Sequence, residues 1–257
     1  MGYCGPIFKD STFEYIPIPE WSPNPLDPIT YANCPSRNTS YGKSLADFLD
    51  TDVAPYDNED NPLNLDTEGP VIRARNLHVH FDPEFTTNTF GDYWMADKGR
   101  LSPEILNSFQ MGNEVYLIFY AGLSPYSEQV YGNNRPINSL KSYQRLKKNA
   151  YLIGYFRIAE ILDTAEKGKQ GIPDSFRNNA HYKRQEEDKT PVIIRGDDTS
   201  KLLRKAIPLN EWDNQSRKYI PTSVGKKIGI KPVTGLRIMK WLNDEETSLL
   251  IKAMESD

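Results

Sequence analysis

Two apolar runs decide the fold of this chain: Glu114-Val-Tyr-Leu-Ile-Phe-Tyr-Ala-Gly122 and Ala150-Tyr-Leu-Ile-Gly-Tyr-Phe-Arg-Ile-Ala-Glu-Ile-Leu162. Both runs are rich in aromatic and β-branched residues, which favour β-strands. Gly154 inside the second run predicts a β-bulge or the close approach of another backbone. We therefore expect two central strands, with the other elements arranged around them.

The flanking segments predict short strands and short helices in no regular βαβ order. Strands are expected within 13–20, 71–83 and 191–195, and helices near 44–49, after Ser102, within 174–180 and 201–205, and from Asn243 onward. This irregular alternation predicts an α+β fold with a curved, largely antiparallel central sheet and short peripheral helices.

Length and composition indicate a globular chain of one large domain or two small ones. The chain has 257 residues, of which 38% are hydrophobic and 26% charged, and such a chain can bury a sizeable core. We expect a single domain over 1–257, with an acidic, loop-rich segment at 21–70 and a basic loop and helix at 210–257. No apolar run approaches the roughly 20 residues of a membrane helix, and the amino terminus does not resemble a secretory signal. These features predict a cytoplasmic protein without a membrane partner.

Charge is distributed unevenly along the chain. Residues 1–70 carry three cationic and twelve acidic side chains, a net charge of −9, whereas residues 141–240 carry 22 cationic and eleven acidic ones, a net charge of +11. The basic region predicts a nucleic-acid partner, and the acidic 21–70 segment offers a surface for a protein partner. Ordinary solvated surface charge is the alternative explanation for both.

The three histidines of the chain form one hypothesis. His78, His80 and Asp82 alternate along a predicted strand and so share a face, while His181 lies far away in the sequence. His78, His80 and His181 are candidate ligands of a divalent metal. His80, Asp82 and His181 are equally candidates for metal-free acid–base catalysis, with the aspartate orienting an imidazole. A purely structural role is the third alternative.

Two further groups are candidates for substrate binding. The small residues after Tyr120, including Gly122, leave room for a planar ligand, on which Tyr120 and Tyr155 would stack. Arg195 precedes a Gly-Asp-Asp turn and a predicted helix, and could hold a phosphate there. Core packing of the tyrosines and simple capping of the helix are the alternatives. The sequence lacks the Gly-x-Gly-x-x-Gly, Gly-x-Ser-x-Gly and Cys-x-x-Cys motifs, which disfavours nicotinamide enzymes, common serine hydrolases and zinc ribbons.

Several short motifs follow one another along residues 3–209. They are Tyr3-Cys-Gly-Pro-Ile-Phe8, Phe13-Glu-Tyr-Ile-Pro-Ile-Pro-Glu20, His78-Val-His-Phe-Asp-Pro-Glu-Phe85, Gly91-Asp92, Phe119-Tyr-Ala-Gly-Leu123, Ile153-Gly-Tyr-Phe156, Asn179-Ala-His-Tyr182, Ile194-Arg-Gly-Asp197 and Ser200-Lys-Leu-Leu203. Their order resembles the third of the nucleotide-modification-associated domain families. That resemblance implies an association with base-modification systems, and it implies no particular reaction. Residues 114–162 are also similar in pattern to PUA-like domains of the EVE and ASCH groups, which implies a curved barrel that binds RNA or a modified base.

Three functional hypotheses follow. The first is a protein of nucleic-acid modification that binds a nucleotide or a modified base. The second is a nucleotide-directed transferase or hydrolase that uses His80, Asp82 and His181, with or without a metal. The third is a protein-interaction module.

Overall fold

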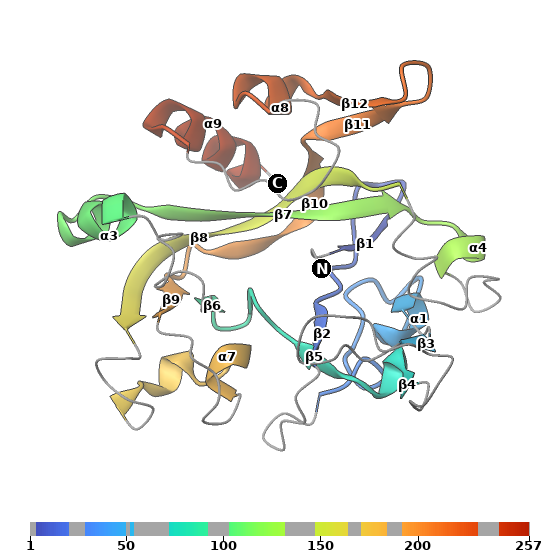
Figure 1. Ribbon diagram of the computed structural model, residues 1–257, viewed down its shortest axis with the longest axis horizontal. Helices are drawn as coiled ribbons and strands as arrows, with labels where there is room; N and C mark the ends of the chain where they lie inside the picture. The colour runs from blue at the N-terminus through green and yellow to red at the C-terminus, as the bar shows by residue number, and fades with distance from the viewer. Residues whose placement is uncertain are drawn as a thin grey trace, which may run out of the picture.

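The sheet at the centre of the molecule is built on the two strands that the apolar runs predict. The computed structural model describes residues 4–20, 29–49, 52–53, 72–91, 103–131, 147–163, 171–183, 192–230 and 242–256. Within them, β7 (Tyr116–Pro125) pairs antiparallel with the 15-residue β8 (Asn149–Asp163). Both strands run through the middle of the molecule (Figure 1).

The remaining strands extend this pair into a strongly curled half-barrel. The strand order is β1-β7-β8-β9-β6, and β10 also pairs with β8. The added strands are β1 (Cys4–Ile7), β6 (Thr89–Gly91), β9 (Val192–Gly196) and β10 (Lys201–Pro208). Only β1 runs parallel to its neighbour in this sheet, so the sheet is mostly antiparallel. The fold is α+β, as the sequence predicts.

β8 pairs on one edge with two successive strands, and this arrangement explains its length. Its first half pairs with β10 and its second half with β9, with register shifts in both ladders. At Gly154 an added Cβ would lie 2.6 Å from the carbonyl oxygen of Lys201 and 2.7 Å from Cε1 of Phe85. The close approach predicted at this glycine is therefore confirmed.

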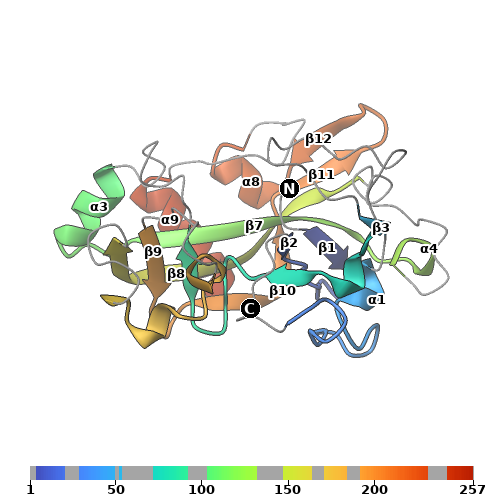
Figure 2. The same ribbon diagram turned by 60° about the horizontal axis from the view of Figure 1, so that its bottom comes forward.

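Smaller elements lie on the two sides of the sheet. The amino-terminal part contains β2 (Ile18–Glu20), α1 (Ala46–Leu49), β3 (Asp52–Val53), β4 (Ile72–Arg73), a 3-10 turn (Ala74–Asn76) and β5 (His78–His80). The others are α3 (Pro103–Gln110), α4 (Glu128–Tyr131), a 3-10 turn (Asp174–Phe176), α7 (Ala180–Lys183), the hairpin β11 (Asn210–Asp213) and β12 (Lys218–Pro221), α8 (Ser223–Lys227) and α9 (Asp244–Glu255). In Figures 1 and 2, α8, α9 and the β11–β12 hairpin lie on one side of the sheet, and β2, β5 and α7 lie on the other.

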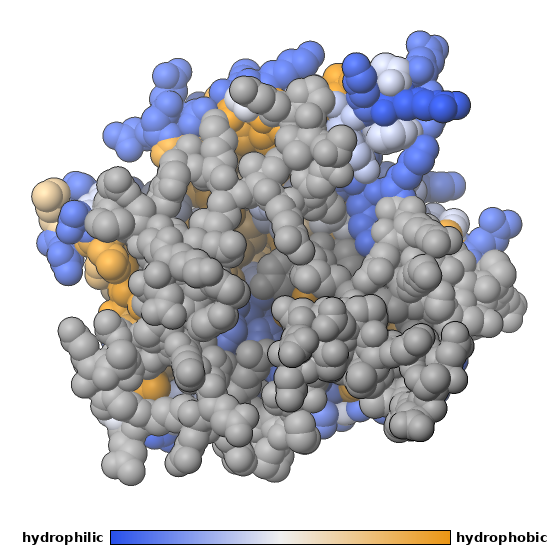
Figure 3. All heavy atoms as spheres, viewed as in Figure 1, coloured by the Kyte–Doolittle hydropathy of each residue, from blue (hydrophilic) through white to orange (hydrophobic). Residues whose placement is uncertain are grey.

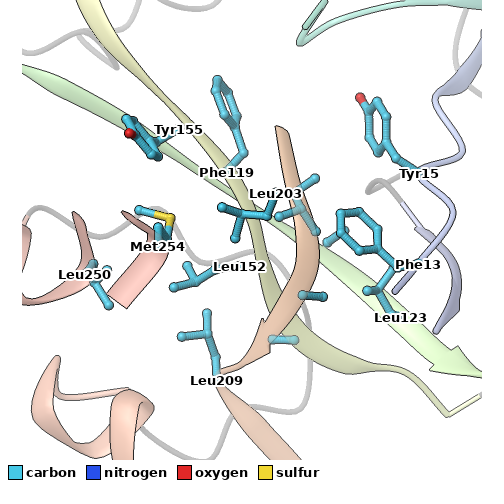
Figure 4. Packing of buried hydrophobic residues seen from close by; sticks show 14 of the residues in the cluster. Phe13, Tyr15, Phe119, Leu123, Leu152, Tyr155, Leu203, Leu209, Leu250 and Met254 are labelled. Atoms are coloured by element: carbon cyan, nitrogen blue, oxygen red, sulfur yellow. The ribbon is translucent and has the colours of Figure 1, made fainter. Parts of the chain in front are cut away.

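The hydrophobic core is divided between the sheet and the amino-terminal part. The largest cluster joins the sheet to α9 through Leu250, Ile251 and Met254, and Figure 4 shows the last of these beside Tyr155. A second cluster, which includes Tyr31, Phe48 and Val79, packs the segments around β5. Asn243 caps α9 in a capping box with Glu246, as expected from the sequence. Among the helices that the structure describes, none is long and apolar enough to cross a membrane.

Three local predictions differ from the structure. The predicted helix at Lys201–Lys205 is wrong, because this segment is β10 and its pairing with β8 overrides the helix propensity of Lys and Leu. Much of the loop predicted in the first part of 210–257 is the β11–β12 hairpin followed by α8. The expected strand at 71–83 is interrupted by the 3-10 turn between β4 and β5. Parts of the acidic 21–70 segment and of the basic 141–240 region lie outside the described residues.

Candidate functional site

The structure brings His80, Asp82 and His181 together. Each of these residues offers one nitrogen or oxygen atom, and the three atoms lie within 4.8 Å of one another. The imidazole rings of His80 and His181 meet edge to face, with their centroids 4.9 Å apart and their planes at 90°. The convergence of these distant residues makes this group, hereafter the histidine cluster, the leading candidate site.

His80 is positioned by the pairing of β2 with β5. Glu20 lies opposite His78 in this ladder, so its side chain reaches His80 diagonally across the two strands. Oε2 of Glu20 lies 2.7 Å from Nδ1 of His80, and both side chains are buried. This contact fixes the orientation of the imidazole and directs Nε2 away from Glu20.

Asp82 is held by hydrogen bonds to one of its two oxygens. Oδ1 accepts from the backbone N–H of Gly91 at 2.8 Å and from Nδ2 of Asn179 at 3.1 Å. The turn between β5 and β6 brings Gly91 back to Asp82, and two mutual backbone hydrogen bonds between Glu84 and Thr89 close this turn. Oδ2 is thereby directed toward His181.

His181 projects from α7, a helix of only four residues that is anchored by its neighbours. Phe176 and Ile172 precede it and pack in a buried cluster with Leu162 of β8 and Ile193 of β9. Nε2 of His181 lies 3.2 Å from Oδ2 of Asp82, and its backbone N–H donates to Oδ1 of Asn179 at 2.9 Å. Asn179 therefore bridges Asp82 and the helix that carries His181.

Gly91 forms a wall of the cluster that leaves no room for a side chain. A Cβ atom at this position would lie 2.9 Å from Oδ1 of Asn179 and 3.1 Å from Cδ2 of His181. Only a residue without a side chain fits here without displacing one of these groups. The position of β6 beside β9 thus contributes directly to the geometry of the histidine cluster.

The histidine cluster is almost entirely removed from water. His80 is 3% exposed and Asp82 is 4% exposed, whereas the side chain of His181 is 12% exposed. Buried charged groups require partners, and here each imidazole has a carboxylate beside it. In the view of Figure 3, hydrophilic residues are visible near the centre of the molecule.

This arrangement can carry out two kinds of chemistry. Two imidazoles, each oriented by a carboxylate, form a set that can remove a proton from one group and donate one to another. The same nitrogen and oxygen donors are the ligand types of transition metals such as zinc and iron. His80, Asp82 and His181 are the residues that would hold such an ion.

The other residues predicted from the sequence lie elsewhere. His78 is half-buried on β5 and is not a member of the histidine cluster. Nη2 of Arg195 lies 3.3 Å from Oε2 of Glu160 on the adjacent strand, and both side chains are about one-third exposed. The turn after Arg195 leads into strand β10, so no helix amino terminus is available there for a phosphate.

Tyr120, Gly122 and Tyr155 belong to the central strands rather than to the histidine cluster. β7 continues past Gly122 to Pro125, so Tyr120 and Gly122 lie within the strand and not at its exit. Gly154 faces Phe85, and the alternation of side chains directs Tyr155 to the opposite face of the sheet. There Tyr155 is 3% exposed and packs within the core that includes residues of α9.

Glu20, Gly91 and Asn179 are site residues that were not selected from the sequence. Each lies within one of the short motifs that carry the resemblance described above, yet no local pattern identifies a hydrogen-bond partner far away in the chain. Glu20 ends an extended segment that contains Pro17 and Pro19, which predicts an edge strand but not its partner. Asn179 precedes His181 by two residues, a spacing that indicates only a local turn.

A further buried carboxylate, Glu14, lies outside the cluster. Glu14 is fully buried, and its carboxylate accepts from Oγ of Ser36 at 2.6 Å and from the backbone N–H of Arg37 at 3.0 Å. Burial raises the pKa of Glu14, although these hydrogen bonds and the charge of Arg37 act in the opposite direction. These contacts indicate a structural role for Glu14, because they attach the segment at 36–38 to the amino-terminal strands.

Comparison with known proteins identifies a family for the chain. No curated protein and no solved structure matches it. A family described as nucleotide modification associated domain 3 matches residues 1–253, which include every residue of the histidine cluster and its hydrogen-bond partners. The chain therefore belongs to the nucleotide modification associated domain 3 family, and this membership suggests a role linked to nucleic-acid modification.

Proposed function

We propose that the protein is an enzyme of nucleic-acid modification that acts on a nucleotide at the histidine cluster. The observation that carries this proposal is the convergence of His80, Asp82 and His181 within 4.8 Å. Family membership supports a nucleotide as the substrate class, and the residues of the cluster support the chemistry.

The pairing of each imidazole with a carboxylate supports catalysis. Asp82 lies against Nε2 of His181, and Glu20 lies against Nδ1 of His80. A carboxylate in this position fixes the ring and stabilises its protonated form. Two such pairs side by side would allow one imidazole to act as a base and the other as an acid on the same nucleotide. His181 is the more exposed of the two, so it is the group that a nucleotide would meet first.

Binding of the nucleotide would draw on the basic region at 141–240. Residues 141–240 carry a net charge of +11, which favours the approach of a phosphate-bearing substrate. Arg195 remains a candidate for phosphate binding, and its contact with Glu160 at the surface is of the kind that a phosphate can replace. Stacking on Tyr155 is not part of this proposal, because that side chain is buried in the core.

A direct assay separates catalysis from binding. The purified protein is incubated with mononucleotides and with single- and double-stranded DNA and RNA, and the nucleosides are analysed by mass spectrometry. We expect at least one nucleoside with a changed mass, and we expect this product to be absent with His181→Ala. Retention of an unchanged nucleotide by the wild-type protein would instead support a binding protein and would overturn the proposed enzyme.

A further inference from the structure

We propose that His80, Asp82 and His181 bind one divalent transition-metal ion, with Glu20 and Asn179 as outer partners that orient the ligands. This inference rests on the proposed function for the role of the ion. It deepens that function because it names the group that the same site would hold. The binding of the ion itself is tested without any nucleotide.

The distances within the histidine cluster suit a shared ion. Ligands about 2.0–2.2 Å from one metal lie about 3–4 Å from each other. Nε2 of His181 and Oδ2 of Asp82 are 3.2 Å apart, which is the spacing of two adjacent ligands as well as that of a hydrogen bond. The full donor set lies within 4.8 Å, so a movement of about one ångström would bring the third donor into range.

The identity of the donors restricts the kind of ion. Two imidazoles and one carboxylate suit zinc or ferrous iron and leave positions open for water or substrate, whereas magnesium and calcium prefer oxygen ligands. We therefore assign the site to a first-row transition ion, with Zn2+ and Fe2+ as the candidates.

The partners around the donors are those of a metal site. A metal-bound histidine usually contacts a carboxylate or a carbonyl through its other nitrogen, and Glu20 occupies that position beside Nδ1 of His80. Oδ1 of Asp82 is held by Gly91 and Asn179, so Oδ2 is the oxygen directed toward the ion. These contacts would hold the ligands in place before the ion binds.

Charge balance provides an independent argument. Glu20, His80 and Asp82 are each less than a tenth exposed. Buried carboxylates are stabilised by a nearby positive charge. A divalent cation held between Asp82 and the two imidazoles would supply one.

The test is metal content after removal and return of the ion. The full chain is stripped with a chelator, supplied with Zn2+, with Fe2+ in the absence of oxygen, or with Mg2+, and passed through a desalting column before elemental analysis. We expect about one Zn2+ or Fe2+ per chain and no retained Mg2+. We expect this ion to be lost in His80→Ala, His181→Ala and Asp82→Asn.

Asp82→Asn keeps the proposal testable if the histidine variants fail to fold. An asparagine can still accept from Gly91 and Asn179 through its oxygen, so the turn is preserved while the charged ligand is removed. Asp174→Asn, which changes an exposed carboxylate six residues before Ala180, serves as the matched control and should retain the ion. Visible absorption of Co2+ in place of the native ion would report nitrogen and oxygen ligation in the wild-type protein.

Three results would overturn the metal site. They are the absence of stoichiometric metal in the wild-type protein, metal that survives both His181→Ala and Asp82→Asn, and metal that depends on His78 but not on His181. Product formation by the stripped protein would overturn the role of the ion in the reaction and leave the proposed function standing. Stoichiometric metal without a product from any nucleotide would support the metal site and overturn the proposed function.

Discussion

Oε2 of Glu20 lies 2.7 Å from Nδ1 of His80, although the two residues are 60 positions apart in the chain. The contact crosses the β2–β5 ladder, and both side chains are buried there. A glutamate at the end of a short strand thus determines how an imidazole in the neighbouring strand is oriented. This relationship makes Glu20 a positioning residue for whatever chemistry the histidine cluster performs.

Glu20→Gln should weaken the site without unfolding the protein. The amide can still contact Nδ1 of His80 but removes the charge, and loss of such an outer carboxylate typically lowers metal affinity or activity by about 10–100-fold. Metal affinity and nucleoside conversion are the measurements. Glu245→Gln, at an exposed position in the first turn of α9, is the matched control. An unchanged metal affinity and rate in Glu20→Gln would contradict the positioning role.

Asn179→Ala should destabilise the fold and disturb the cluster together. The substitution removes one of the two hydrogen bonds to Oδ1 of Asp82 and the acceptor of the backbone N–H of His181. Loss of such contacts at a largely buried site should cost about 1–3 kcal/mol, and urea unfolding measures this loss. The exposed neighbour Asn178 provides the control, since Asn178→Ala should leave the free energy of unfolding within about 0.5 kcal/mol of wild type. Equal effects of the two substitutions would argue against the bridging role of Asn179.

Gly91→Ala should impair the site more than the fold. The added methyl group would press against Asn179 and His181 at distances that require one of them to move. Gly112→Ala is the control, because it should affect the fold and not the site. Gly112 has a φ of +80° and open space around it. That substitution should cost about 1–2 kcal/mol of stability while the rate of nucleoside conversion stays at the wild-type level. A normal rate of nucleoside conversion in Gly91→Ala would show that position 91 accommodates a side chain.

Glu14 should make stability depend on pH. Burial raises the pKa of the Glu14 carboxyl above the ordinary value of 4.5. Between pH 4.5 and this raised pKa, the folded chain therefore holds a proton that the unfolded chain has released. The free energy of unfolding contributed by this group therefore falls as pH rises through that window and is level above it. Urea titrations between pH 4 and pH 8, compared for wild type and Glu14→Gln, isolate this contribution. Parallel pH profiles for the two proteins would contradict the raised pKa.

Nucleic-acid binding by the basic region should be salt-dependent. If Lys218 of β12 and its neighbour Arg217, both exposed, contact phosphates, oligonucleotide affinity should fall steeply between about 50 and 200 mM salt. Lys218→Glu should lower the affinity and reduce the slope, whereas Lys252→Glu on α9 should change neither. Fluorescence anisotropy with a labelled oligonucleotide measures both quantities. Binding that is absent or insensitive to salt would contradict a role of the basic region in nucleic-acid binding.

The elements that the sequence predicts correctly are those with strong local signals. β7 and β8 follow from their apolar runs, α3 from the Ser102-Pro103 start, and α9 from Asn243 and the acidic residues after it. The first part of β10, Lys201–Lys205, is predicted as a helix because the polar turn before it could cap one. Its true conformation depends on the neighbouring edge of β8, which is a tertiary effect.

The β11–β12 hairpin was missed because its turn uses unusual chemistry. Arg217 adopts a φ of +52° before β12, a conformation that sequence reasoning expects of glycine or asparagine. The histidine cluster was only partly predictable, because some of its contacts are local in the sequence and others are not. The His80-x-Asp82 spacing is local, and His181 was chosen by residue type, whereas the partnership of Glu20 with His80 arises only when two distant strands pair.

The dispersal of the cluster along the chain also bears on protein synthesis. Glu20 and His181 are 161 positions apart, and Asn179 closes the gap between Asp82 and α7. A nascent chain that has emerged only as far as β6 therefore contains His80 and Asp82 without the partner that completes the group. The complete arrangement can form only after residue 181 has left the ribosome.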